Sequence, residues 1–349
     1  MNAARKQIGV GVIGLGFIGR THLAAYNAAA AAGDDCRVVA VCDQDADRRS
    51  GLTSSAGGHA ELESKQAGRL FNPADVRGYA KVEELLADDQ VDLVSICTPT
   101  DTHVAVAIAA LDAGKHVLLE KPVAVRSADV ARLREHVEHS DRLCMPAMCM
   151  RFWPGWDLLK ESIDDGRYGR VRSAVFQRVG NAPGWSHFYA DESRSGGALV
   201  DMHIHDADFV RWCFGDPRRV RSAGSTRHVL THYEFTNGPE LVVAEGGWIE
   251  AAGFPFNMRY RVEFEQAALE FEMSRDKPLM ISENGESRPI VLPAHNGYDV
   301  EVREMLATIA GGERVLRATV AEAERVAVLL EAERESLRTG RAVSQPFSP

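Results

Sequence analysis

The sequence predicts an α/β protein of two domains, in which an N-terminal doubly wound parallel sheet is followed by an α+β domain with an open, mainly antiparallel sheet. The chain has 349 residues, which is more than one ordinary core requires. Up to residue 148, apolar strand-like runs alternate with helical patterns, and beyond residue 170 strand follows strand. We therefore expect domains at residues 1–148 and 149–349, with the last helices able to pack back on the first domain.

The first strand-to-helix unit covers residues 7–33, QIGVGVIGLGFIGRTHLAAYNAAAAAG. Gly14, Gly16 and Gly19 have GxGxxG spacing and join an apolar strand to an Ala-rich helix. In that context the first glycine permits a tight turn, the second lets the backbone approach a pyrophosphate, and the third allows close helix packing. The unpaired N–H groups of the helix N-terminus attract phosphate. This pattern predicts a Rossmann dinucleotide site that includes Gly14, Gly16, Phe17, Ile18 and Gly19.

Asp43 ends the next strand, RVVAVCD at residues 37–43. An acidic residue at this place accepts hydrogen bonds from the adenosine ribose and repels a 2′-phosphate. We therefore expect NAD rather than NADP as the cofactor. Arg48 and Arg49 lie close by in the sequence and could partly offset that repulsion. The alternative for Asp43 is a solvated carboxylate at a strand end.

A polar segment from about residue 48 to 78 is followed by further alternation of helix and strand, at residues 81–88, 91–99, 102–114 and 116–122. Ligands of doubly wound sheets bind beyond the carboxyl ends of the strands. Lys121 falls at such an end and is a catalytic candidate, although lysines at strand ends are often only solvated. The further cofactor-binding candidates in this half are Thr98, Pro99, His103, Glu120 and Lys121.

Residues 197–215, GALVDMHIHDADFVRWCFG, read as one short amphipathic helix. Asp201 and His205 are four residues apart and share a helix face; Asp208 lies close to that face, and His203 points away. The alternative is an ordinary surface helix. A metal site at these four residues ranks last, because side chains two apart on a continuous helix diverge by about 200°.

Between residues 143 and 160 a strand runs into a turn and then a helix, and we place the domain boundary there. Arg151 and Trp153 leave that strand, so Arg151 could reach a polyol or phosphate; the alternative is a surface arginine stacked on Trp153. The loop 180–195 combines aromatic and polar residues, as sugar sites do. The expected substrate-binding residues are Arg151, Trp153 and Trp185.

Alternating strands at residues 225–235, 240–250, 258–266 and 268–274 predict a β-meander. One face of such an open sheet must be covered, either by the helices that follow or by a second copy of the sheet. We predict a homodimer or homotetramer formed through this sheet.

The composition narrows the class of function. The formal net charge of −10 argues against nonspecific nucleic-acid binding, and no apolar run reaches the roughly 18 residues of a membrane span. The six cysteines include no CxxC pair and fit reduced thiols. We expect a cytoplasmic protein whose partner is a small molecule.

Four segments together, GLGFIG, CTPTDTH, GKHVLLEKP and DMHIH, resemble the Gfo/Idh/MocA family of nicotinamide-dependent oxidoreductases in order and spacing. The resemblance implies a Rossmann domain followed by an open-sheet domain, and NAD(P)-linked oxidation or reduction of sugars, cyclitols and their derivatives. It also implies that Lys121 lies near the nicotinamide, with Pro122 often following a cis peptide bond. By the same resemblance, Asp201 and His205 hold and deprotonate the substrate hydroxyl, in a cleft between the two domains.

The expected chemistry is oxidation of a ring secondary hydroxyl, with hydride transfer to nicotinamide C4. His205 is the candidate base, because its titration range suits proton abstraction near neutral pH. Lys121 would stabilise developing alkoxide character, and Asp201 would hold an adjacent hydroxyl. No phosphate clamp is evident, so a neutral sugar or cyclitol is expected. An NAD-dependent redox glycosidase and a non-catalytic sugar or nucleotide sensor on the same fold remain alternatives.

Overall fold

The computed structural model describes residues 7–52, 69–184, 186–311 and 315–344, and the chain divides into two compact units. Unit 1 comprises residues 1–149 and 296–324, and unit 2 comprises residues 150–295 and 325–349. Residues 296–324 therefore group with the N-terminal domain, although they follow the second domain in the sequence.

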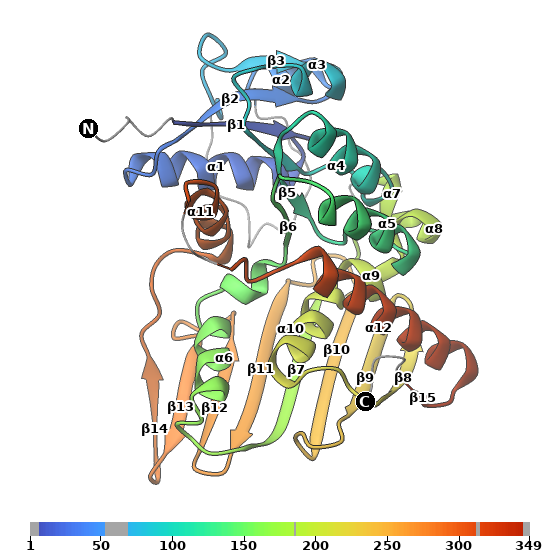
Figure 1. The fold of residues 1–349 in the computed structure, drawn as a ribbon. Coiled ribbons are helices and arrows are strands. Elements are labelled where there is room, and N and C mark those ends of the chain that lie inside the picture. Colours follow the sequence, from blue (N-terminus) through green and yellow to red (C-terminus); the bar gives the residue numbers. More distant parts are fainter. Residues whose placement is uncertain (1–6, 53–68, 185, 312–314, 345–349) are drawn as a thin grey trace. The chain divides into compact units, whose positions relative to one another are not determined.

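Unit 1 is built on a six-stranded sheet of order β3-β2-β1-β4-β5-β6, in which every neighbouring pair is parallel (Figure 1). The strand order reverses between β1 and β4, where doubly wound folds bind ligands. This confirms the predicted parallel sheet. The strands are β1 (Ile8–Ile13), β2 (Cys36–Cys42), β3 (Arg77–Tyr79), β4 (Leu93–Ile96), β5 (His116–Glu120) and β6 (Cys144–Ala147).

Helices pack against this sheet because its strands are apolar on both faces, as the fully buried β1 illustrates. One of them, α11, follows unit 2 in the sequence but packs against α1 and near β5. The helices are α1 (Phe17–Ala31), α2 (Ala46–Arg49), α3 (Val82–Leu86), α4 (His103–Asp112), α5 (Ser127–Glu138) and α11 (Gly297–Ile309), with the 3-10 turn η1 (Thr100–Thr102). A second 3-10 turn is η2 (Cys149–Phe152).

Unit 2 is built on a nine-stranded sheet of order β14-β13-β12-β11-β7-β10-β9-β8-β15. The pairs are antiparallel except for β7 and β10, which run parallel, so the predicted mainly antiparallel sheet is confirmed. The expected simple meander is wrong in one respect, because β7 lies between β10 and β11 (Figure 1). The strands are β7 (Val171–Asn181), β8 (Arg219–Ser225), β9 (His228–Glu234), β10 (Leu241–Ile249), β11 (Asn257–Phe264), β12 (Ala267–Glu272), β13 (Leu279–Glu283), β14 (Glu286–Ile290) and β15 (Val343–Ser344).

Helices cover one face of this sheet, where α6, α10 and α12 lie side by side in Figure 1. The core between these helices and the sheet contains packed aromatic rings. The ring centroid of Trp156 lies 4.9 Å from that of Phe209 and 5.2 Å from that of Tyr260. The helices are α6 (Trp156–Asp164), α7 (His187–Ala190), α8 (Glu192–Ser195), α9 (Gly197–Asp201), α10 (Ile204–Phe214) and α12 (Val320–Thr339).

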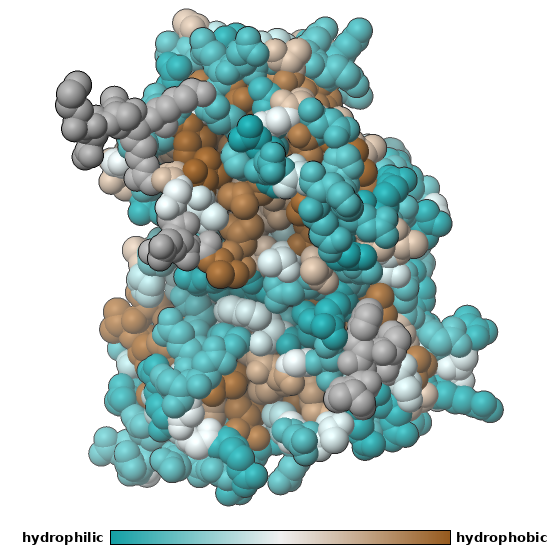
Figure 2. Space-filling view, in the orientation of Figure 1, coloured by the Kyte–Doolittle hydropathy of each residue, from teal (hydrophilic) through white to brown (hydrophobic). Residues whose placement is uncertain are grey.

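Hydrophilic side chains predominate on the face of the molecule shown in Figure 2. Across the described ranges, no helix combines the length and the apolar character needed to cross a membrane. The six cysteines carry free thiols, and burial is the main reason that the pKa of Cys36 and that of Cys42 rise to about 11. These thiols are therefore protonated at neutral pH.

Candidate active-site residues

The glycine-rich turn after β1 has the geometry that the sequence predicts. Gly14 has a φ of +88°, which favours glycine. A Cβ at Gly19 would lie 1.8 Å from the carbonyl oxygen of Gly14, whereas a Cβ at Gly16 would have no heavy atom within 4 Å. Gly19 is therefore required by packing within the turn, and Gly16 borders open space at the start of α1. That open space beside a helix N-terminus fits a pyrophosphate.

Asp43 lies directly after β2, as expected, and its carboxylate binds the glycine-rich turn. Its Oδ2 accepts a hydrogen bond from the backbone N–H of Leu15 at 2.7 Å, and its Oδ1 accepts one from the N–H of Asp45 at 2.9 Å. The guanidinium of Arg48 lies 3.8 Å from Oδ2. The carboxylate therefore holds the turn in place from the strand end at which a ribose contact was expected.

Lys121 is partly exposed at the carboxyl end of β5, and the peptide bond between Lys121 and Pro122 is cis. Thr98 and Pro99 follow β4, the neighbouring strand. The hydroxyl of Thr98 lies 2.7 Å from that of Thr102. These candidates therefore lie at the carboxyl ends of two neighbouring parallel strands.

His103 and Glu120 differ from the expected direct contact with a cofactor, because their side chains are buried and contact the protein itself. The two ring nitrogens of His103 lie 2.7 Å and 2.8 Å from the carbonyl oxygens of Pro122 and Thr98. Glu120 lies 2.9 Å from His22, and its second oxygen accepts a hydrogen bond from the N–H of Lys121. Both residues therefore brace the segment that carries Lys121.

The segment 197–215 is not the single helix that we expected, since α9 ends at Asp201 and α10 begins at Ile204. Asp201 and His205 are both partly exposed on either side of the break. His203 sits within the break and is completely buried. The two predicted catalytic residues are therefore more exposed than the histidine between them.

His203 is held by two elements far away in the sequence. Its Nε2 lies 2.9 Å from the carboxylate of Glu333 on α12 and 3.1 Å from the hydroxyl of Tyr233 on β9. Burial lowers the pKa of His203, but the charge of Glu333 and its hydrogen bond outweigh burial, so the pKa is raised. The imidazole therefore links the sheet to α12.

The structure corrects the expectation that Arg151 contacts the substrate. Its side chain is fully buried and cannot serve as an exposed substrate contact. Its guanidinium donates to both carboxylate oxygens of Asp208, at 2.6 Å and 2.9 Å, and lies over the ring of Trp212 rather than that of Trp153. Trp153 is partly exposed. Trp185 lies outside the described residues.

The remaining acidic residue of the segment, Asp206, is also paired with an arginine. It is completely buried and accepts a hydrogen bond from Arg178 on β7 at 2.9 Å. The break at residues 202 and 203 removes the geometric ground for ranking a metal site last, since that ground assumed a continuous helix. His203 and Asp208 are nevertheless buried, whereas Asp201 and His205 are partly exposed.

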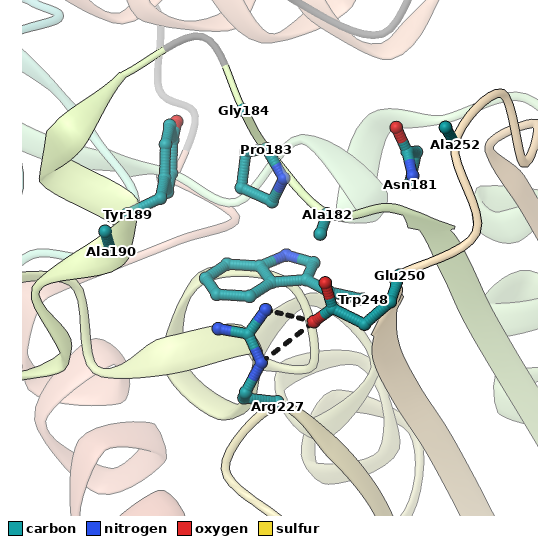
Figure 3. Close-up of a pocket in the computed structure, with 10 residues that line it drawn as sticks. All are labelled: Asn181, Ala182, Pro183, Gly184, Tyr189, Ala190, Arg227, Trp248, Glu250 and Ala252. Atoms are coloured by element: carbon teal, nitrogen blue, oxygen red, sulfur yellow. Dashed lines mark hydrogen bonds and ion pairs between the residues drawn. The ribbon is translucent and has the colours of Figure 1, made fainter.

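A pocket of about 310 Å³ opens where β7 and β10 end (Figure 3). The indole of Trp248 forms one wall, and the guanidinium of Arg227 lies over it at 5.5 Å and binds Glu250. Asn181 donates to the carbonyl oxygens of Ile249 and Ala251, both at 3.0 Å. Of the loop residues that the sequence suggested, Asn181 and Tyr189 line this pocket. Trp248, Arg227 and Glu250 were missed, because they reach the pocket only through strand pairing: β10 pairs with β7, and the turn before β9 brings Arg227 beside Trp248.

Residues 8–148 match the family model described as an oxidoreductase family with an NAD-binding Rossmann fold, and residues 156–268 match the model of the GFO/IDH/MocA C-terminal domain. The chain belongs to the Gfo/Idh/MocA family. The resemblance inferred from the four motifs is thereby confirmed, and with it the NAD-binding character of the N-terminal domain.

Curated relatives of this Gfo/Idh/MocA chain include inositol dehydrogenases. It is 31% identical to the myo-inositol 2-dehydrogenase of Thermotoga maritima over 59% of this chain and 55% of that enzyme, so the match spans just over half of the relative. It is 26% identical to the inositol 2-dehydrogenase of Rhizobium meliloti over 87% of this chain and 89% of that enzyme.

Solved structures of Gfo/Idh/MocA type share the fold over nearly the whole chain. A levoglucosan dehydrogenase in complex with NADH and levoglucosan has a TM-score of 0.81 at 21% identity, covering 97% of this chain and 99% of that one. A UDP-N-acetylglucosamine 3-dehydrogenase from Acidithiobacillus ferrooxidans has a TM-score of 0.73 at 23% identity, covering 95% and 97%. At these identities the likeness establishes the fold alone.

Proposed function

We propose that this chain is an NAD-dependent dehydrogenase that oxidises a ring secondary hydroxyl of a sugar, cyclitol or derivative. The observation that carries the proposal is the contrast within residues 201–208. Asp201 and His205 are partly exposed, whereas His203, Asp206 and Asp208 are buried with protein partners. The inositol dehydrogenases among the relatives support a cyclitol or sugar as the substrate class.

In this mechanism His205 accepts the proton of the substrate hydroxyl, because a neutral imidazole is a competent base near neutral pH. The ammonium of Lys121 donates a hydrogen bond to the same oxygen and stabilises the negative charge that develops there. Asp201 accepts a hydrogen bond from an adjacent hydroxyl and so fixes the ring. The nicotinamide, when bound, supplies the C4 position that takes the hydride.

The preference for NAD rests on Asp43. A carboxylate at the end of β2 repels a 2′-phosphate, and the hydrogen bond from the N–H of Leu15 keeps it beside the glycine-rich turn. Arg48, at 3.8 Å from Oδ2, neutralises part of this charge but leaves the carboxylate oriented. We therefore expect a larger kcat/KM with NAD than with NADP.

The test is a screen for NADH formation over polyols, monosaccharides, sugar acids and sugar phosphates, with a deglycosylation assay alongside. On the best substrate, His205→Ala and Lys121→Ala should each lower kcat by about 10² or more while the affinity for NAD is kept. His139→Ala, at the exposed C-terminal end of α5, is the matched control and should retain kcat. Near-normal turnover of His205→Ala or Lys121→Ala would overturn the assignment, and turnover without net NADH would favour the glycosidase.

A further inference from the structure

Three ionisable side chains that the proposed reaction does not use meet inside unit 1. They are His22 of α1, Glu120 of β5 and Glu301 of α11, and we call them the His22 cluster. Their exposed fractions are 0%, 5% and 0%. One nitrogen of His22 and one oxygen of each carboxylate all lie within 4.8 Å of one another. The cluster thus joins a helix, a strand and a second helix that arrives from the far end of the sequence.

Glu301 has an unusual environment. Neither of its carboxylate oxygens has a hydrogen-bond partner among the residues that the structure describes. Burial, followed by the charges of Glu120 and Glu304, raises its pKa well above the usual value. Glu304, one turn further along α11, instead has a partner for each oxygen. The backbone N–H of Arg317 donates a hydrogen bond to Oε1 at 2.7 Å, and the guanidinium of Arg317 forms an ion pair with Oε2 at 2.9 Å. A buried carboxyl group without partners is costly in either protonation state, and a bound ligand would offset that cost.

The orientation of His22 indicates what that ligand is. Its Nδ1 lies 3.1 Å from the hydroxyl of Ser95, which lies 2.9 Å from that of Tyr26. When Nδ1 carries the proton and donates to Ser95, the lone pair of Nε2 faces the two carboxylates. Histidines that bind metal ions have this arrangement, in which the second ring nitrogen is fixed by a hydrogen bond.

The charges and donor atoms of the cluster also fit a cation. A neutral imidazole with two carboxylates carries a charge of −2, which one divalent ion neutralises. One nitrogen and two oxygen donors suit zinc and related transition metals, whose bonds to such atoms are about 2.0–2.2 Å long. Donor atoms that all bind one such ion lie within about 4.4 Å of one another, close to the separation found here.

We propose that His22, Glu120 and Glu301 bind one divalent transition-metal ion of the zinc class. The ion fastens α11 to α1 and β5. It also holds Glu120, whose second carboxylate oxygen accepts a hydrogen bond from the N–H of Lys121 at 3.0 Å. The role is structural, and it is independent of the substrate and of the reaction proposed above.

The experiment uses the full chain, treated with a chelator, dialysed into metal-free buffer and titrated with ZnCl₂. Calorimetry should show about one zinc ion bound per chain, and the melting temperature should rise on binding. Glu301→Gln keeps the size of the side chain but removes its charge. It should weaken zinc binding by at least the roughly 10–100-fold that loss of even an outer-shell partner causes.

Glu304→Gln is the matched control, since it removes a buried carboxylate from the same helix outside the cluster, and it should bind zinc as the wild type does. His22→Asn provides a second test that does not depend on the folding of Glu301→Gln, and it should also lose zinc. A wild-type chain that takes up no zinc and shows no change in melting temperature would overturn the proposal. Equal zinc affinity in wild type, Glu301→Gln and His22→Asn would overturn it as well.

Discussion

At the scale of single residues, Asp208 forms a two-hydrogen-bond ion pair with a buried arginine inside unit 2. Arg151 and Asp208 are at most 1% exposed, and two hydrogen bonds join them. Asp208→Asn removes the charge but little volume, so the buried guanidinium of Arg151 loses the carboxylate charge that these two hydrogen bonds bring to it. We expect the free energy of unfolding, measured in urea, to fall by about 3–5 kcal/mol.

Glu335→Gln is the control for this prediction. It removes the same kind of ion pair, to Arg338, but at the surface of α12, where water screens both charges. No measurable loss of stability is expected there. If Asp208→Asn were as stable as Glu335→Gln, the buried pair would contribute nothing net to the fold.

Residue spacing in the sequence made Asp201 and His205 catalytic candidates, because both belong to one local segment. The same spacing placed Asp208 close to their face, whereas the structure turns it towards Arg151, 57 residues away in the sequence. The helix is interrupted at residues 202 and 203, between α9 and α10, without a glycine or proline there to signal the interruption. It coincides with the burial of His203 against Glu333, a tertiary contact that periodicity alone does not reveal.

At the scale of elements, the turn between β1 and α1 separates two uses of glycine. In Gly19→Ala the new Cβ would meet the backbone oxygen of Gly14 at 1.8 Å, and a backbone atom cannot move aside cheaply. The loss of stability should be about 1–3 kcal/mol, which outweighs the roughly 1 kcal/mol that alanine gains over glycine within a helix. Urea unfolding measures it.

Gly16→Ala is the matched variant, because nothing lies within 4 Å of its new Cβ. Its stability should change by less than about 1 kcal/mol, the scale of an altered helix cap. Its affinity for NADH, measured by fluorescence titration, should fall, since the methyl group occupies the space expected for the pyrophosphate. Unchanged NADH affinity in Gly16→Ala, or a Gly19→Ala protein more stable than wild type, would contradict this division of roles.

Element types were largely predictable, while element pairing was predictable only in the first domain. In unit 1 each strand is followed by a helix and then by a parallel strand, so local order fixes most of the sheet. In unit 2 the neighbours β7 and β10 are separated in the sequence by four helices, α7 to α10, and by the strands β8 and β9. Their parallel pairing creates the pocket at Trp248, which is why sequence patterns missed it.

At the scale of the whole molecule, the sheet of unit 2 has a second face that the helices of the same unit do not cover. Side chains alternate along β11, so that Met258 and Tyr260 are buried while Arg259 and Arg261 are exposed. On β9 and β10, which β7 separates from β11, the exposed fractions of Leu230 and Leu241 are 43% and 42%, high for large apolar side chains. A face that mixes exposed leucines with charged residues is suited to association with a second copy.

We therefore expect the chain to form a homodimer or homotetramer through this face, as the open sheet predicts. Sedimentation velocity at micromolar concentration should give the mass of at least two chains. Leu230→Glu puts a charged side chain in place of an exposed leucine of this face, and burying that charge against a second copy would be costly. The variant should sediment as a smaller species, while Glu286→Gln, on the edge strand β14, should leave the assembly unchanged. A monomeric wild type at that concentration would contradict the prediction, because the exposed leucines would then have no partner of this kind.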